Sequence, residues 1–181
     1  MPFEIPKLSA LSTQPQARDL LLGVTLANRA PSYLFAGPSG CGKATHALSL
    51  VKTLFCAGGK DCPGCPSCRQ VGAHSHPDLI WVDRAYVAAH TKGEGKTLAI
   101  NFESIQSLCG ALQSAPFAAP LRAAVIPDAD RMNEAAQDVL LKTLEEPSPK
   151  TLLILTADNG MGWGAHGLFA AGKIGQAVLF Q

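Results

Sequence analysis

The stretch Gly37-Pro38-Ser39-Gly40-Cys41-Gly42-Lys43-Ala44-Thr45 decides the fold of this chain. A short apolar run at residues 33–36 precedes it, and apolar residues with helical spacing follow it up to residue 54. Strand, glycine-rich turn and helix in this order predict a phosphate-binding loop. Glycines let backbone N–H groups turn toward a phosphate, and the positive end of the helix dipole lies beside them. We therefore predict a phosphate cradle formed by Gly37, Gly40, Gly42 and Lys43.

The residue after the lysine departs from this pattern. A Ser or Thr is expected there because its hydroxyl holds Mg²⁺, and this chain has Ala44. Thr45 comes one helical step later, and each step turns a side chain by about 100° around the helix axis. Its hydroxyl should therefore point away from the same metal. We expect a real loop with an impaired metal site.

The composition is that of a globular protein. The 181 residues are 47% hydrophobic and 16% charged, which suits one domain with a full core. No apolar run approaches the length of a membrane span, and no secretory signal is visible, so we expect a cytoplasmic protein without a membrane partner. The net charge of +1 gives no long-range attraction for nucleic acid.

Apolar strands alternate with amphipathic helices, which predicts an α/β fold with a parallel sheet flanked by helices. We expect strands at residues 33–36, 78–83, 121–128 and 151–157. We expect helices at residues 14–28 with Thr13 as N-cap, from the loop to about residue 55, and from the caps Asn101 and Asn133. Residues 84–100 are predicted to be an exposed excursion, and His74 and His76 to be solvated turn residues.

Four cysteines lie in a Gly- and Pro-rich segment directly after the helix of the loop. Because this segment has almost no apolar side chains, it cannot fold around a core of its own, and four thiolates on one metal would order it. We predict a closed structural zinc site. The C-x₂-C-x₂-C spacing is also typical of an iron–sulfur run, which remains the alternative. The predicted ligands are Cys56, Cys62, Cys65 and Cys68.

The third predicted strand ends in a second metal-binding pattern. Asp128 follows its apolar residues, as in sites where a carboxylate holds Mg²⁺ opposite a phosphate loop. An ATPase then offers a Glu for the attacking water, and here the residue is Ala129. Asp130 should point to the opposite face. The coincidence of Ala44 and Ala129 favours a relaxed need for hydrolysis. Thr156, near the end of the fourth strand, is a candidate phosphate sensor, although Thr is also a good strand former.

Several motifs in one order resemble a known family. They are the glycine-rich loop, the four-cysteine insert, His76-Pro77-Asp78-Leu79, the run from Asp128 to Asn133, and Leu140-Leu141-Lys142-Thr143-Leu144-Glu145-Glu146-Pro147. Over residues 13–159 they resemble the N-terminal AAA+ domain of bacterial sliding-clamp-loader subunits of DNA polymerase III. Ala44 and Ala129 fit the non-hydrolysing delta-prime type, whereas the gamma/tau type is the active ATPase.

The resemblance implies an AAA+-type P-loop domain at residues 1–159, with a zinc-binding module inserted at 56–68. It implies a structural member of a ring that opens the sliding clamp and places it on primed DNA, in contact with other loader subunits. It also places Thr156 at the sensor position. We expect no catalytic residue, and weak or absent binding of ATP and Mg²⁺. The alternatives are an active gamma/tau-type ATPase that uses Thr45 and Asp130, and a small-molecule kinase with no substrate pocket that can be named.

The resemblance ends after Asn159. We expect residues 160–181 to form a Gly-rich tail that does not match the family, and we expect neither its small helical lid nor its collar domain in this sequence. The family's Ser-Arg-Cys arginine, which completes a neighbour's ATP site, has no counterpart, and Lys173 falls near another expected arginine. Truncation, a shifted reading frame or added expression sequence would each produce such a tail.

Overall fold

The computed structural model describes residues 6, 8–58, 62, 64–91, 99–158 and 176–180. Five strands within them form one sheet in the order β2-β3-β4-β1-β5, and all four neighbouring pairs are parallel. The strands are β1 (Ser32–Ala36), β2 (Leu79–Trp81), β3 (Arg122–Ile126), β4 (Thr151–Ala157) and β5 (Gln176–Leu179). The helices are α1 (Pro15–Leu22), α2 (Lys43–Phe55), α3 (Pro66–Gly72), α4 (Arg84–His90), α5 (Phe102–Gln113) and α6 (Glu134–Glu145). Two short 3₁₀ helices are η1 (Leu8–Ala10) and η3 (Ala129–Arg131). The predicted α/β class is confirmed.

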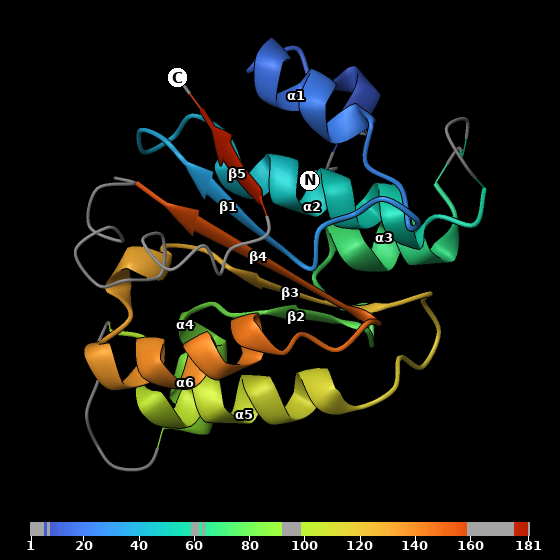
Figure 1. Ribbon diagram of the computed structural model, residues 1–181. Coiled ribbons are helices and arrows are strands. Elements are labelled where there is room, and N and C mark those ends of the chain that lie inside the picture. The colour runs from blue at the N-terminus through green and yellow to red at the C-terminus, as the bar shows by residue number, and fades with distance from the viewer. Residues whose placement is uncertain are drawn as a thin grey trace.

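Helices cover both faces of the sheet. In Figure 1, α1, α2 and α3 lie on one side of it, and α4, α5 and α6 lie on the other. Alternate residues of a strand point to opposite faces, so Phe35 of β1 packs in the core beneath α2 while Leu34 packs in the core beneath α5 and α6. Every residue of β1 and β4 is buried, as expected for central parallel strands. Among the described residues, no helix has the length and apolar character that a membrane span requires.

The predicted helix starts at Asn101 and Asn133 are confirmed. The Asn101 side chain accepts a hydrogen bond from the Ser104 N–H at 3.0 Å, and the Asn133 side chain accepts one from the Ala136 N–H at 2.9 Å. Each bond satisfies a backbone donor that the first turn of a helix leaves without an intrahelical partner. These caps fix where α5 and α6 begin.

The prediction for the first helix is wrong at both ends. Gln14, not Thr13, occupies the N-cap position, and it does so in a left-handed conformation without a side-chain cap. The helix ends at Leu22 instead of continuing to residue 28. The reason is a separate turn in which the Asn28 side chain donates to the Gly23 carbonyl at 2.9 Å.

The segment predicted as an exposed excursion contains a helix. Asp83 caps α4 by accepting a hydrogen bond from the Tyr86 N–H at 2.8 Å, and His90 at the other end stacks on the Tyr86 ring. Residues 92–98 lie outside the described part of the chain. His76 was also wrongly predicted as solvated. It is buried because its ring packs 4.8 Å from the ring of Phe55, whereas His74 is exposed.

Strand β5 was not predicted. It comes from the segment interpreted as a tail, and it pairs with β1 so that Leu34 lies opposite Ala177. Directly after it, the Phe180 N–H donates to the Ala36 carbonyl at 2.7 Å, and the Phe180 ring is buried against Phe35. Residues 159–175 and 181 lie outside the described part of the chain. The described end of the chain therefore contributes to the core beside the glycine-rich loop.

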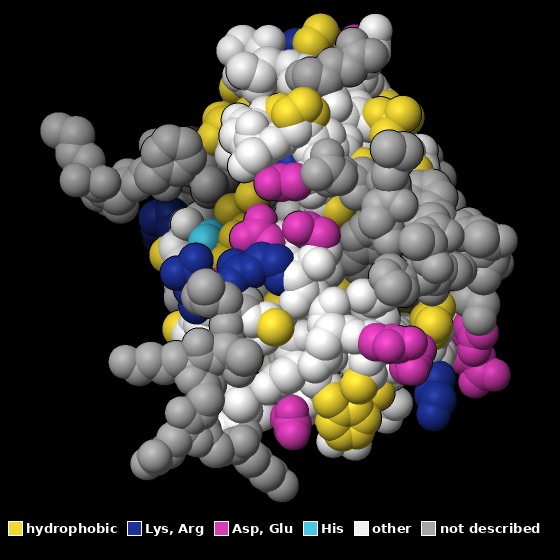
Figure 2. All heavy atoms as spheres, turned by 90° about the vertical axis from the view of Figure 1, so that its left-hand side faces the viewer, with side chains coloured by type: hydrophobic (Ala, Val, Ile, Leu, Met, Phe, Trp, Pro, Cys, Tyr) yellow, Lys and Arg dark blue, Asp and Glu magenta, His cyan; other side chains and the backbone are white. Residues whose placement is uncertain are grey.

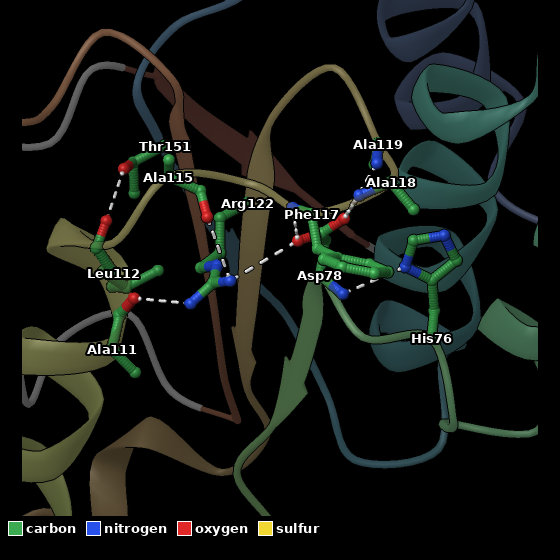
Figure 3. Close-up of polar contacts among 10 residues, drawn as sticks. All are labelled: His76, Asp78, Ala111, Leu112, Ala115, Phe117, Ala118, Ala119, Arg122 and Thr151. Carbon is green, nitrogen blue, oxygen red and sulfur yellow. Dashed lines mark hydrogen bonds and ion pairs between the residues drawn. The ribbon is translucent and has the colours of Figure 1, made fainter.

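Asp78 organises the end of the sheet that lies opposite this loop (Figure 3). Its fully buried carboxylate accepts hydrogen bonds from the N–H groups of Phe117, Ala118 and Ala119 at 2.6, 2.7 and 2.8 Å. The Arg122 guanidinium lies 3.5 Å from the same carboxylate and donates to two carbonyls near the end of α5. One aspartate before β2 thus holds residues 117–119, in the middle of the connection between α5 and β3.

Candidate functional site

The predicted phosphate cradle is the turn between β1 and α2. Gly40 and Gly42 have φ angles of 77° and 93°, in the left-handed region that glycine adopts without a steric penalty. Gly42 is the N-cap of α2, so Lys43 opens that helix. Gly37 is required for a different reason: a Cβ there would collide with the carbonyl oxygen of Phe180. The first glycine of the cradle therefore serves the packing of β5.

The Lys43 side chain is folded back into the loop. Its Nζ lies 2.8 Å from the carbonyl oxygens of Gly37 and Pro38, and 2.8 Å from Oδ1 of Asp158. Only 6% of the lysine side chain is exposed, against 38% of the aspartate side chain. The bond from Lys43 holds the pKa of Asp158 below its ordinary value, against the opposing effect of burial, and a bond from Ser39 adds to the lowering.

Sequence reasoning missed Asp158. It follows β4 directly and reaches Lys43 across 115 positions of sequence. The Gly37 N–H donates to the Ala157 carbonyl at 3.3 Å, and this bond brings the end of β4 against the start of the loop. The available signal for this ion pair was an acidic residue directly after an apolar strand, β4, that neighbours β1. It required knowledge that β4 pairs with β1.

Asp128 and Thr156 come together at the same edge of the sheet. The Asp128 N–H donates to Oγ1 of Thr156 at 3.3 Å, which joins the ends of β3 and β4. The Asp128 side chain is 58% exposed and lies 3.8 Å from the Arg131 guanidinium. Figure 2 faces this edge and shows acidic and basic side chains next to each other near its centre. The described part of this face is thus mixed in charge.

The residues that replace the expected metal and water ligands lie at the same edge. Ala129 is fully buried, and Asp130 is exposed in η3. Ala44 and Thr45 are half-buried in the first turn of α2. The arrangement therefore retains a lysine, a strand-end aspartate and a strand-end threonine, with methyl groups at the two positions where ATPases carry a hydroxyl and an acid.

The four predicted metal ligands converge. The Sγ atoms of Cys56, Cys62, Cys65 and Cys68 all lie within 4.8 Å of one another, and those of Cys62 and Cys68 are 4.0 Å apart. Tetrahedral zinc with Zn–S bonds of about 2.3 Å requires sulfur atoms about 3.8 Å apart. The donor set therefore fits zinc with only small adjustments, and the four thiolates would close its coordination shell.

The surroundings of the four thiols favour a bound cation. The N–H groups of Cys65 and Gly64 donate to the Cys62 sulfur at 3.1 and 3.4 Å, and together with the Cys56 thiol they lower the pKa of Cys62 to about 6. Burial raises the pKa of Cys56 and of Cys68. Four sulfurs this close cannot all ionise without a compensating positive charge, which a divalent metal supplies.

The cysteine module is attached to the main domain through α2 and α3. Cys56 follows the last residue of α2, and Cys65 is the N-cap of α3, which carries Cys68. The Ser67 hydroxyl donates to the Phe55 carbonyl at 3.3 Å and joins the two helices directly. A metal at this site would hold the end of one helix against the start of the other.

Comparison with known proteins agrees with this architecture. A family model described as "DNA polymerase III, delta subunit" matches residues 14–162. The delta' subunit of DNA polymerase III from Bacillus subtilis is 31% identical over 148 residues, which cover 80% of this chain and 42% of that protein. The delta' subunit from Haemophilus influenzae is 30% identical over 145 residues, covering 71% and 37%. The tau subunit from Escherichia coli is 30% identical over 136 residues, covering 74% and 19%.

A solved structure has the same fold. A gamma subunit-related protein of DNA polymerase III from Thermotoga maritima superposes with a TM-score of 0.53 at 14% identity, covering 92% of this chain and 46% of that one. The chain thus spans less than half the length of the relatives that it matches. The family match over residues 14–162, together with these relatives, means that the chain belongs to the DNA polymerase III delta-subunit family and resembles its delta-prime members.

Proposed function

We propose that this chain acts in DNA replication as a structural subunit of a sliding-clamp loader and does not hydrolyse ATP. Its role is to hold neighbouring subunits of the ring in register. It reaches the sliding clamp and primed DNA through that assembly. Curated relatives named as delta' and tau subunits of DNA polymerase III support the assembly, and the residues of the cradle support the absence of hydrolysis.

The observation that carries the proposal is the pair Ala44 and Ala129. Hydrolysis of ATP requires a hydroxyl on Mg²⁺ next to the lysine and an acid that orients the attacking water. A methyl group at each position offers no lone pair to a metal or to a water molecule. Ala129 is fully buried, so its methyl group does not reach solvent and cannot contact an attacking water molecule there. The side chain of Asp128 is mostly exposed beside Arg131, and residue 44 offers no hydroxyl that could share a metal ion with it.

The zinc module has a structural role in this proposal. Its four thiols meet away from the phosphate cradle, at the opposite end of α2. A closed Cys₄ site leaves no open coordination position for a substrate. In this proposal zinc stabilises the domain. ATP with Mg²⁺ binds weakly or not at all at the phosphate cradle.

The alternative is an active ATPase of the gamma/tau type. The relatives named as tau subunits, at about the same identity as the delta' subunits, favour it. Such an enzyme would use Thr45 and Asp130. It would require a local geometry in which Asp130, exposed in η3, turns toward the lysine.

The test is ATP titration with and without Mg²⁺, followed by a turnover assay on the same sample. We expect binding that is weak or absent, with no gain from Mg²⁺, and no turnover above that of a Lys43→Ala variant. Turnover that the Lys43→Ala substitution abolishes would refute the proposal and favour the alternative. Assembly is measured separately, by gel filtration of the chain mixed with the gamma/tau and delta subunits of the same bacterium. Failure to co-elute would refute the structural role.

A further inference from the structure

We propose that Asp158 keeps the phosphate cradle closed by acting as an internal anion for Lys43. The carboxylate takes the place that a phosphate would occupy on the lysine ammonium. The cradle is then an autoinhibited anion site: its backbone is retained, and its cation is already neutralised from within the chain. This inference does not depend on whether the chain joins a loader ring.

The first argument is a count of donors. A lysine ammonium has three protons to donate. Three oxygens lie 2.8 Å from Lys43 Nζ: the carbonyls of Gly37 and Pro38, and Oδ1 of Asp158. All three protons are therefore engaged inside the protein. An incoming phosphate has to displace one of these oxygens, and the carboxylate is the one that carries a competing charge.

The second argument is the way Asp158 is held. It follows β4, whose last residue, Ala157, accepts a hydrogen bond from the Gly37 N–H. The Asp158 carboxylate itself lies 2.8 Å from Nζ of Lys43, which opens the helix after the loop. The lysine itself is 6% exposed, so water screens this ion pair less than it screens a pair on the open surface. Asp158 is thus tied to the loop at two points, through the backbone of its neighbour Ala157 and through its own carboxylate.

The third argument concerns the ligand. A triphosphate would place several negative charges beside Asp158, and the side chain that should hold a neutralising Mg²⁺ next to the lysine is replaced by Ala44. Repulsion from Asp158 would then act without the metal that compensates for it in an ATPase. Removing the carboxylate should therefore open the cradle to polyphosphates.

The experiment is isothermal titration calorimetry with sodium tripolyphosphate, and then with ATP, on the full chain with zinc present. Asp158→Asn keeps the shape of the side chain and removes its charge. We expect this variant to bind tripolyphosphate about tenfold more tightly than the wild type, which corresponds to about 1.4 kcal/mol. Asp138→Asn is the matched control, because Asp138 is exposed on α6 and its loss changes the net charge equally.

Two further variants make the test decisive. Asp158→Ser removes the same charge with a smaller side chain and should give the same gain. Lys43→Ala combined with Asp158→Asn should lose the gain, because the freed cation is then absent. Equal affinity of Asp158→Asn and Asp138→Asn would overturn the proposal. So would a gain that persists without Lys43, or unfolding of both Asp158 variants, because the ion pair would then maintain the fold instead of closing the cradle.

Discussion

Replacement of Asp78 by alanine should strongly lower the free energy of unfolding of the domain. The carboxylate is fully buried and accepts three backbone N–H groups within 2.8 Å, with the Arg122 guanidinium beside it. Alanine leaves those three donors without an acceptor and the guanidinium without its counter-ion. Breaking a buried charged pair by removing one partner typically costs about 3–5 kcal/mol, and we expect about 4 kcal/mol here.

This loss is large relative to the total stability of a domain, which is about 5–15 kcal/mol. For a chain of this size, each kcal/mol lowers the melting temperature by roughly 2–4 °C, so the midpoint should fall by roughly 8–16 °C. Urea unfolding followed by circular dichroism measures the free energy directly. Asp83→Ala is the matched control, because Asp83 accepts one N–H at an exposed helix start and its loss should cost about 1 kcal/mol. Equal destabilisation by the two substitutions would refute the reasoning.

The same carboxylate predicts a pH dependence. Burial by itself raises the pKa of Asp78, but the three N–H donors and Arg122 outweigh it, so the pKa lies below its ordinary value of 3.8. The folded pKa is thus lower than the unfolded one, and the stabilisation is complete above the unfolded pKa. It is lost as the pH falls through the folded pKa. The difference in unfolding free energy between wild type and Asp78→Ala should stay constant from pH 7 to about pH 5 and shrink below about pH 4.

Three further predictions test the metal, the loop and a helix cap. Elemental analysis should find one zinc per chain, and either a chelator or the Cys68→Ser substitution should lower the melting temperature. Visible absorbance from iron, in place of zinc, would favour the iron–sulfur alternative. Gly37→Ala should lower the free energy of unfolding by about 1–3 kcal/mol, because the added methyl group collides with Phe180. Gly110→Ala lies in open space on α5 and should raise the free energy of unfolding by about 0.5–1 kcal/mol. Thermal melts that rank the two variants in the opposite order would contradict this packing. Asn133→Ala should cost about 1 kcal/mol in urea unfolding, and no change would mean that its cap does not support α6.

Local signals in the sequence predicted most of the fold. The loop, its flanking strand and helix, and the caps Asn101 and Asn133 are recognisable because each depends on residues within a few positions of one another. The four cysteines are equally local, and their sulfur atoms meet as predicted. Helix α4 was missed although Asp83 provides a cap, because the glycines and charges further along indicated a loop.

Contacts between distant segments were not predictable in this way. Strand β5 has four residues, and only its pairing with β1 distinguishes it from a tail. An aspartate before a strand carries no local sign that it will accept three N–H groups from a segment about 40 positions away, as Asp78 does. Asp158 reaches Lys43 across an even longer separation. The resemblance to a family indicated where the phosphate cradle lies, but it did not predict that Asp158 pairs with Lys43.

The length of helix α2 limits which sequence changes can be tolerated during evolution. It begins with the cradle lysine and ends one residue before Cys56, the first of the four cysteines that could hold a metal ion. Its 13 residues form a rod about 20 Å long. Inserting or deleting a single residue within it would rotate one end against the other by about 100° and shift it by about 1.5 Å. The length of α2 is therefore fixed by the two sites at its ends. Substitutions within it should be tolerated far more readily than insertions or deletions.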